Sequence, residues 1–459
     1  MLDGLVIVVR RLPLLVAGLL SLHCFAGRAF AQTSAASTRA EGDTAVRQVQ
    51  SLVLGAVYEQ LAVANPRAAA ARANARAAAA RIASAKRPPD PQLQLGFMNR
   101  ELPSLRPMEP LGMTQVQLMQ MVPLAGKLGL AGSVAEAQAA AARGLADDVR
   151  WDVRALAAMA FYDLYQTDRS LDVAISTRRL LQDIAATAST MYAVGEGRQP
   201  DVLRAQVEIA RMSEDIVRME TMRISMDARL AALLDRAPVA DPPSPLLPAL
   251  PAELPPLDSL LRLAEANRPM IHAGEAELRG AEAAVTLARR ELWPDLEIGV
   301  QYGQRSGAMG VGTERMGSLM LGVSLPVFAR SRQLQMREET VAMRAMAAAD
   351  LAAMRAETRG RVAVAYADWR RARNLSDLYR STILPQTQAT ITSSLAAYRV
   401  GNVNFMTLLD NQMTLNRYQQ ELYALAAEQG KALAELEMLI GRELFDPTVV
   451  AAPAARTER

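Results

Sequence analysis

The sequence of 459 residues has few of the side chains on which most enzyme sites depend. It contains one cysteine, Cys24, and two histidines, His23 and His272. Histidine-based catalytic triads, cysteine nucleophiles and the usual zinc sites need more of these residues than the chain offers. We therefore predict a protein that is not an enzyme and that binds no cofactor and no structural metal.

Aromatic residues and charge of one sign are also scarce. Aromatic residues make up 4% of the chain, and the formal net charge is only +3 although 22% of the residues are charged. Acidic and basic residues are interspersed, which argues against nucleic acid as a partner. Abundant alanine and arginine with few aromatics favour long helices over an all-β sandwich.

Long hydrophobic runs are missing outside the amino terminus. Arg10 and Arg11 precede an apolar run over 12–25, and Ala29-Phe30-Ala31 follows it, which is the pattern of a secretory signal peptide (1–31) cleaved after Ala31. Lipid attachment at Cys24 is the alternative, although His23 stands where a small residue is expected. Beyond Ala31 no segment approaches about 20 consecutive apolar residues, so we expect membrane residence only as a β-barrel.

The chain contains an internal repeat. Pro66, Pro91 and Pro123 recur 203 residues later in similar surroundings, and the motif Tyr192-Ala-Val-Gly195 recurs as Tyr398-Arg-Val-Gly401. The segment 238–256 holds eight of the 24 prolines, so we expect an extended, unpacked linker there. The predicted organisation is a disordered segment (32–48), a first repeat (49–237), a Pro-rich linker (238–257), a second repeat (258–444) and a C-terminal tail (445–459), with 33–47 and 449–459 disordered.

Each repeat shows the same order of predicted elements. A helix (51–86 or 258–292) precedes two strands, and a long helical hairpin follows. Apolar and polar residues alternate over about 91–99 and 114–122 in the first repeat and over about 295–304 and 316–325 in the second, although the alternation breaks at Met119. Strands of this length suit a tilted crossing of a bilayer, but a soluble half-buried hairpin has a similar pattern.

The predicted helices decide between these alternatives. The segment 131–194 has no proline and, beyond Gly132 at its start, only Gly144, so we expect a helix on the order of 95 Å long. The segment 330–400 is similar except at Pro385, where we expect a kink or local re-pairing. Four strands cannot close a barrel, and open edges are costly in lipid. Three copies with twelve strands leave a lumen, so we expect a homotrimeric barrel continued by helices.

Four features occur together and in order. They are the repeat, the Pro-x-Leu-x-Leu strand starts, the segment Val122-Pro123-Leu-Ala-Gly-Lys127 and the Tyr-x-Val-Gly helix breaks. In this combination the chain resembles the TolC-like outer membrane efflux proteins. The resemblance implies a mainly α protein whose four strands per chain form a 12-stranded barrel in the trimer, joined to a periplasmic helical barrel. It further implies an outer membrane location and a passive exit duct for metal cations or drugs, served by a periplasmic adaptor and an inner-membrane pump of the RND type.

The resemblance also implies roles for residues at the hairpin tips. The adaptor is expected to dock at the helix breaks, which are Tyr192, Val194, Gly195, Val400 and Gly401. Asp410 matches an acidic residue of the pore constriction, and Thr407 stands where a second carboxylate is usual. Asp201 matches a partner of the tyrosine at 398 in a network that closes the tip, and Val403 replaces the basic member of that network.

Other residues remain open at this stage. Phe97 and Tyr302 fit an aromatic girdle at the membrane interface or ordinary packing. Most of the 23 methionines fit helix cores; only Met98, Met108 and Met113 lie near an external loop, so a thioether metal site is not predicted. A protein-secretion exit channel of type I shares the expected fold, and a periplasmic coiled-coil adaptor is the alternative from another class.

Overall fold

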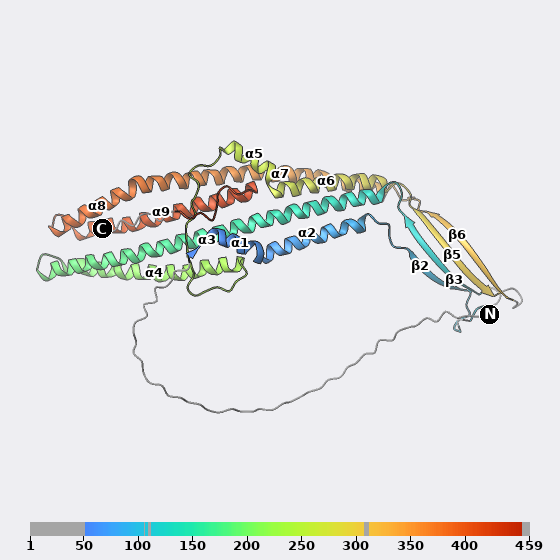
Figure 1. The fold of residues 1–459 in the computed structure, drawn as a ribbon, viewed down its shortest axis with the longest axis horizontal. Helices are drawn as coiled ribbons and strands as arrows, with labels where there is room; N and C mark the ends of the chain where they lie inside the picture. The colour runs from blue at the N-terminus through green and yellow to red at the C-terminus, as the bar shows by residue number, and fades with distance from the viewer. Residues whose placement is uncertain (1–50, 105, 109–111, 307–311, 452–459) are drawn as a thin grey trace, which may run out of the picture. The chain divides into compact units, whose positions relative to one another are not determined.

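Two pairs of shorter helices precede the sheet, one pair in each half of the chain. The computed structural model describes residues 51–459 except 105, 109–111, 307–311 and 452–459, so the predicted signal peptide and 32–48 lie outside it (Figure 1). In the first half, α1 (Leu54–Ala64) and α2 (Pro66–Ala85) precede the sheet; α5 (Leu257–Asn267) and α6 (Pro269–Arg290) do so in the second.

The prediction of one continuous helix at the start of each repeat is wrong. Asn65 and Arg268 have extended backbones, with ψ of 118° and 119°, because each precedes a proline. Pro66 and Pro269 then start new helices, where a missing N–H costs nothing. Asn65 also caps the second helix, since its Oδ1 accepts a hydrogen bond from Ala68 N at 2.9 Å.

Two long helical hairpins dominate the structure. The first pairs α3 (Lys127–Ala193) with α4 (Gln199–Leu233). The second comprises α7 (Gln333–Leu378), a π-helical turn η2 (Tyr379–Ile383), α8 (Leu384–Arg399) and α9 (Phe405–Ile440). The 67 residues of α3 span about 100 Å. The π-helical turn directly precedes Pro385 and is the re-pairing expected there.

The four main strands form one antiparallel sheet at the end of the helices opposite the hairpin turns (Figure 1). They are β2 (Gln92–Met98), β3 (Met113–Val122), β5 (Leu296–Ser306) and β6 (Thr313–Val323), in the order β2-β3-β5-β6. The central pair β3–β5 joins the two halves of the chain. Among the residues that the structure describes, β2 and β6 are the edge strands, and each has a strand partner on one side. A mainly α protein with a small β part is confirmed.

No helix among the described residues is both long and apolar enough to span a bilayer.

The Pro-rich segment is extended, but the prediction that it is unpacked is wrong. Its short strand β4 (Ser244–Pro245) pairs in parallel with β1 (Ser51–Leu52), and Leu246 N donates to Leu52 O at 2.9 Å. Leu247 and Leu250 pack against a core that includes Phe161. Prolines keep the backbone extended, and the leucines between them supply apolar surface that the helices cover.

The C-terminal tail is ordered as far as the structure describes it. Ala249 N donates to Val449 O at 2.7 Å, and Ala451 N donates to Leu247 O at 2.9 Å. Phe445 packs against the same core as Leu250. Disorder predicted from 449 is therefore wrong for 449–451, which pair with the Pro-rich segment; 33–47 and 452–459 lie outside the described residues.

Candidate functional site

Glycines with left-handed backbones form the turns of both long hairpins. Gly195 has φ of +81° and Gly401 has φ of +74°, a region that L-residues rarely adopt. Their amides donate to Tyr192 O and Tyr398 O at 3.1 and 3.0 Å. The valines beside them, Val194 and Val400, are 67% and 69% exposed. Each turn thus presents an apolar side chain at the tip of its hairpin.

The two tip tyrosines differ in environment despite their matching motifs. Tyr192 is 48% exposed, whereas Tyr398 is 5% exposed and packs edge-on against Phe405 with ring centroids 5.8 Å apart. Burial, and secondarily the nearby negative charge of Asp201, raises the pKa of Tyr398. Asp201, at the start of α4, is thus within electrostatic range of Tyr398. Their role in closing the tip stays a prediction.

Thr407 and Asp410 lie in the first turns of α9. Asn404 caps this helix: its Oδ1 accepts from Thr407 N at 2.8 Å and from the Thr407 hydroxyl at 2.9 Å. Asp410 follows one turn later and is exposed, while its neighbours Leu408 and Leu409 are buried. Residues three apart share a helix face, so Thr407 and Asp410 project in similar directions.

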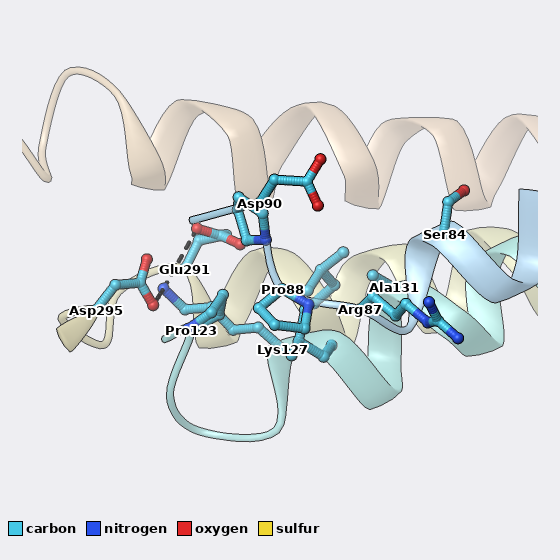
Figure 2. Close-up of a pocket in the computed structure, with 12 residues that line it drawn as sticks. Ser84, Arg87, Pro88, Asp90, Pro123, Lys127, Ala131, Glu291 and Asp295 are labelled. Carbon is cyan, nitrogen blue, oxygen red and sulfur yellow. Dashed lines mark hydrogen bonds and ion pairs between the residues drawn. The ribbon is translucent and has the colours of Figure 1, made fainter. Parts of the chain in front are cut away.

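A buried lysine connects the helices to the sheet, and sequence reasoning assigned it no role. The Lys127 side chain is 6% exposed; its Nζ donates to Trp293 O and Asp295 Oδ1, both at 2.9 Å, and lies 3.5 Å from Glu291 Oε2. Figure 2 shows Lys127 directed at these two carboxylates beside a cavity. The signal in the sequence is a lysine directly after a glycine in a chain with few lysines. In the structure this glycine, Gly126, has φ of +73° and directly precedes α3.

The sheet has two chemically different faces, which follow from the strand register. One face carries a band of apolar side chains that are exposed in the single chain. They are Leu93, Leu95, Phe97, Val116, Leu118, Ile298, Val300, Tyr302, Leu319, Leu321 and Val323. The opposite face carries polar and charged side chains together with methionines. Its polar members are Gln92, Gln94, Gln115, Gln117, Glu297, Gln301, Arg305, Glu314 and Ser318.

Phe97 and Tyr302 both lie on the apolar face, 66% and 48% exposed. Residues that pair across neighbouring strands form a row, which we call a level. Phe97 shares a level with Gln304, and Tyr302 shares the next level on the same face with Leu95, so the two rings are one level apart. The Arg100 guanidinium lies 5.4 Å from the centre of the Phe97 ring. Exposed rings beside a cationic group are typical of a membrane interface, and that role stays a prediction.

Acidic and imidazole groups do not gather into a metal site in the described part of the chain. Among these residues no three or more His, Cys, Asp or Glu side chains are placed to hold an ion. His272, on α6, is half-exposed, with Nδ1 3.7 Å from Glu275 Oε2.

Comparison with known proteins identifies a matching family. The outer membrane efflux protein family matches residues 260–442, which cover most of the second half from α5 to the end of α9. The second half of the chain thus matches the outer membrane efflux protein family. The location of the protein is accordingly the outer membrane, with an extension into the periplasm.

Individual relatives agree with this family assignment. The chain is 23% identical over 322 residues to the cobalt-zinc-cadmium resistance protein CzcC of Cupriavidus metallidurans, covering 70% of this chain and 75% of CzcC. The solved structure of CusC superposes with a TM-score of 0.73 at 16% identity, covering 88% of this chain and 95% of that one. VceC of Vibrio cholerae gives 0.72 at 16% identity, covering 85% and 97%.

Proposed function

We propose that three copies of this chain form a passive exit duct through the outer membrane, fed by a periplasmic adaptor and an inner-membrane pump. Proteins of this family act as trimers in such three-part systems. The observation that carries the proposal is the sheet. In the described part of the chain its edge strands β2 and β6 have no strand partner on their outer sides, and one of its faces is apolar. Sharing these edges among three subunits gives twelve strands and satisfies the backbone in lipid.

The two sheet faces support the same arrangement. The apolar band suits contact with lipid chains, and the opposite face, with its glutamines and charges, suits a water-filled lumen. The helix α3 packs against α6 and α9 largely through alanine side chains. Because alanine is small, these contacts bury little apolar area for their length. Neighbouring subunits are expected to cover the remaining apolar side chains of the hairpins.

The tips are proposed as the gated end of the duct. The exposed residues at the turns, which include Val194 and Val400, form an adaptor-docking surface with Tyr192, Gly195 and Gly401. Three copies of Asp410 ring the pore, and Thr407 lies on the same side of α9. Tyr398 and Asp201 hold the second hairpin against α4 when the tip is closed. Val403 is half-buried and adds no charge to this closure.

Metal cations are the proposed cargo. CzcC is named for resistance to cobalt, zinc and cadmium, and it aligns with most of this chain. A pump of the RND type is the proposed source of energy, because a passive duct does not itself drive transport.

The test is fractionation followed by electrophysiology. The full chain expressed in a Gram-negative host is expected in the outer membrane as a heat-modifiable trimer, and the purified trimer is expected to form ion-conducting pores in planar bilayers. A water-soluble monomer would contradict the proposal. The proposed cargo is tested by expressing the chain together with a metal pump and its adaptor. Higher tolerance of the host to zinc or cadmium, seen only when all three are present, supports metal cations as the cargo. Unchanged tolerance with that pump and adaptor contradicts it.

A further inference from the structure

The methionines of the sheet all lie on its polar face. In the described strands these are Met98, Met113, Met119, Met121, Met316 and Met320. The strand register places each of them level with residues such as Gln92, Gly299 or Glu297 on the same face, and none lies in the apolar band. The apolar face uses leucine, isoleucine, valine and aromatics instead. Methionine is therefore concentrated on the face that carries the glutamines and charged residues, and it is absent from the apolar band of these strands.

Two of these methionines meet above a glycine. Gly299 of β5 pairs with Met119 of β3 on one side and with Met320 of β6 on the other. A Cβ placed on Gly299 would lie 3.3 Å from Met320 Cε and 3.5 Å from Met119 Cγ. Both side chains thus bend over the same small residue, from strands that flank it in the sheet (Figure 1).

The surroundings of this pair are polar, and further methionines lie along the same face. The next level towards the helices contains Met121 beside Glu297, and the next level away from them contains Gln117 and Gln301. Levels on one face are about 7 Å apart. One level beyond the glutamines, Met316 pairs with Gly303, and a Cβ on Gly303 would lie 3.2 Å from Met113 Sδ. Thioether groups therefore recur along the polar face.

We propose that Met119 and Met320 form a binding site above Gly299 for a soft monovalent cation, Cu(I) or Ag(I). Thioethers select such ions over harder divalent metals. Both side chains reach the same glycine from opposite sides, and the flexible methionine side chain allows each sulfur atom to turn towards a shared ion. This site rests on the proposed function for its position in the lumen, where it gives passing ions a place to bind; its thioether chemistry extends the cargo beyond the metals for which CzcC is named.

Silver is the probe, because Ag(I) binds thioethers without a redox step. The purified full-length trimer is titrated calorimetrically with silver nitrate in chloride-free buffer. We expect saturable binding, and the double variant Met119→Leu/Met320→Leu is expected to lose one Ag(I) per chain. Leucine has a similar volume, so the sheet is preserved. The control is Met343→Leu/Met346→Leu, two exposed methionines of α7, which is expected to leave the isotherm unchanged.

A second variant keeps both sulfur atoms. Gly299→Ala places a methyl group against Met119 and Met320, and we expect silver affinity at this site to fall at least fivefold. Absence of saturable binding, or an isotherm unchanged in the double leucine variant, would overturn the site and leave the methionines as packing over glycine. Conductance in planar bilayers is recorded on the same preparations. A trimer that forms pores but does not bind silver overturns only the proposed silver site. A trimer that binds silver but forms no pores overturns the proposed exit duct.

Discussion

Nζ of Lys127, the first residue of α3, lies 2.9 Å from Oδ1 of Asp295, the residue that precedes β5. The pair joins the first long helix to a strand from the other half of the chain. Asp295 Oδ1 also accepts a hydrogen bond from Leu124 N at 3.2 Å, and Asp295 N donates to Ser324 Oγ at 2.9 Å. The carboxylate and the backbone N–H of this one residue thus fix the ends of β3, β5 and β6 relative to α3.

Lys127→Met is predicted to destabilise this junction by about 3 kcal/mol, because it leaves Asp295 and Glu291 without their buried cation. The measurement is the temperature at which the trimer dissociates in detergent gels, which should fall. The control is Arg371→Ala, which removes a half-exposed pair with Glu428 and is expected to change stability by less than about 1 kcal/mol. Equal effects of the two variants would show that Lys127 has no special role.

Gly401→Ala is predicted to destabilise the second hairpin turn by about 1 kcal/mol, because alanine is strained at φ of +74°. Hydrogen exchange of the residues around 391–412 should become faster, and binding of the adaptor should weaken. Gly360→Ala is the matched control. Gly360 lies within α7 with nothing near its would-be Cβ, so alanine there should be neutral or stabilising. Faster exchange in both variants would contradict the prediction.

Asp410→Asn is predicted to raise the conductance of single pores and to weaken their block by divalent and trivalent cations. Three like charges in a narrow ring attract cations, and this attraction is lost with the carboxylate. Thr407→Asp is the opposing variant: it adds a second ring one turn away and should strengthen the block. Conductance and block that respond to neither change, in intact trimers, would remove this part of α9 from the constriction.

Glu437 is predicted to make stability depend on pH. It is 1% exposed, and burial raises its pKa from 4.5 to about 7, against a hydrogen bond from Leu444 N and the charge of Arg154. The folded state then holds a proton that the unfolded chain releases, so stability falls as pH rises from about 4.5 to about 7 and is level above that. The loss reaches about 3 kcal/mol at most.

Glu437→Gln should remove this slope, because the amide keeps an oxygen for Leu444 N and carries no charge. The measurement is the melting temperature of the trimer from pH 4.5 to 8, compared with wild type and with Glu435→Gln, a more exposed neighbour on α9. Parallel curves for wild type and Glu437→Gln would contradict the prediction.

The repeated motifs explain why much of the fold was predictable from the sequence. Proline, glycine and apolar alternation act locally, so the hairpins, their glycine turns and the strands were all visible. Pro66 indicates a break in the first helix as well. The alanines that follow it favour a helix so strongly that composition predicts a continuous one, although Asn65 has an extended backbone. The packing of Leu247 and Leu250 depends on helices far away in sequence, which composition alone does not reveal.

The sheet shows a second limit. Alternation in β3 breaks at Met119 when methionine is counted as apolar, yet the strand continues to Val122 in regular register. The register places Met119 on the polar face of the sheet together with the other methionines. The pairing of β3 with β5, which brings Met119 and Met320 to either side of Gly299, comes from tertiary structure and not from any local pattern.

The π-helical turn at Tyr379–Ile383 holds one more residue per turn than the α-helix around it. Each residue advances an α-helix by about 100°. The wider turn therefore takes up one extra residue without turning the helix that follows it. Deleting one residue from this turn would return it to α-helical pairing and leave Ile391, Ser394 and Tyr398 buried as they are now. The extra residue is compensated within the turn itself, and the second tip keeps the direction in which it faces.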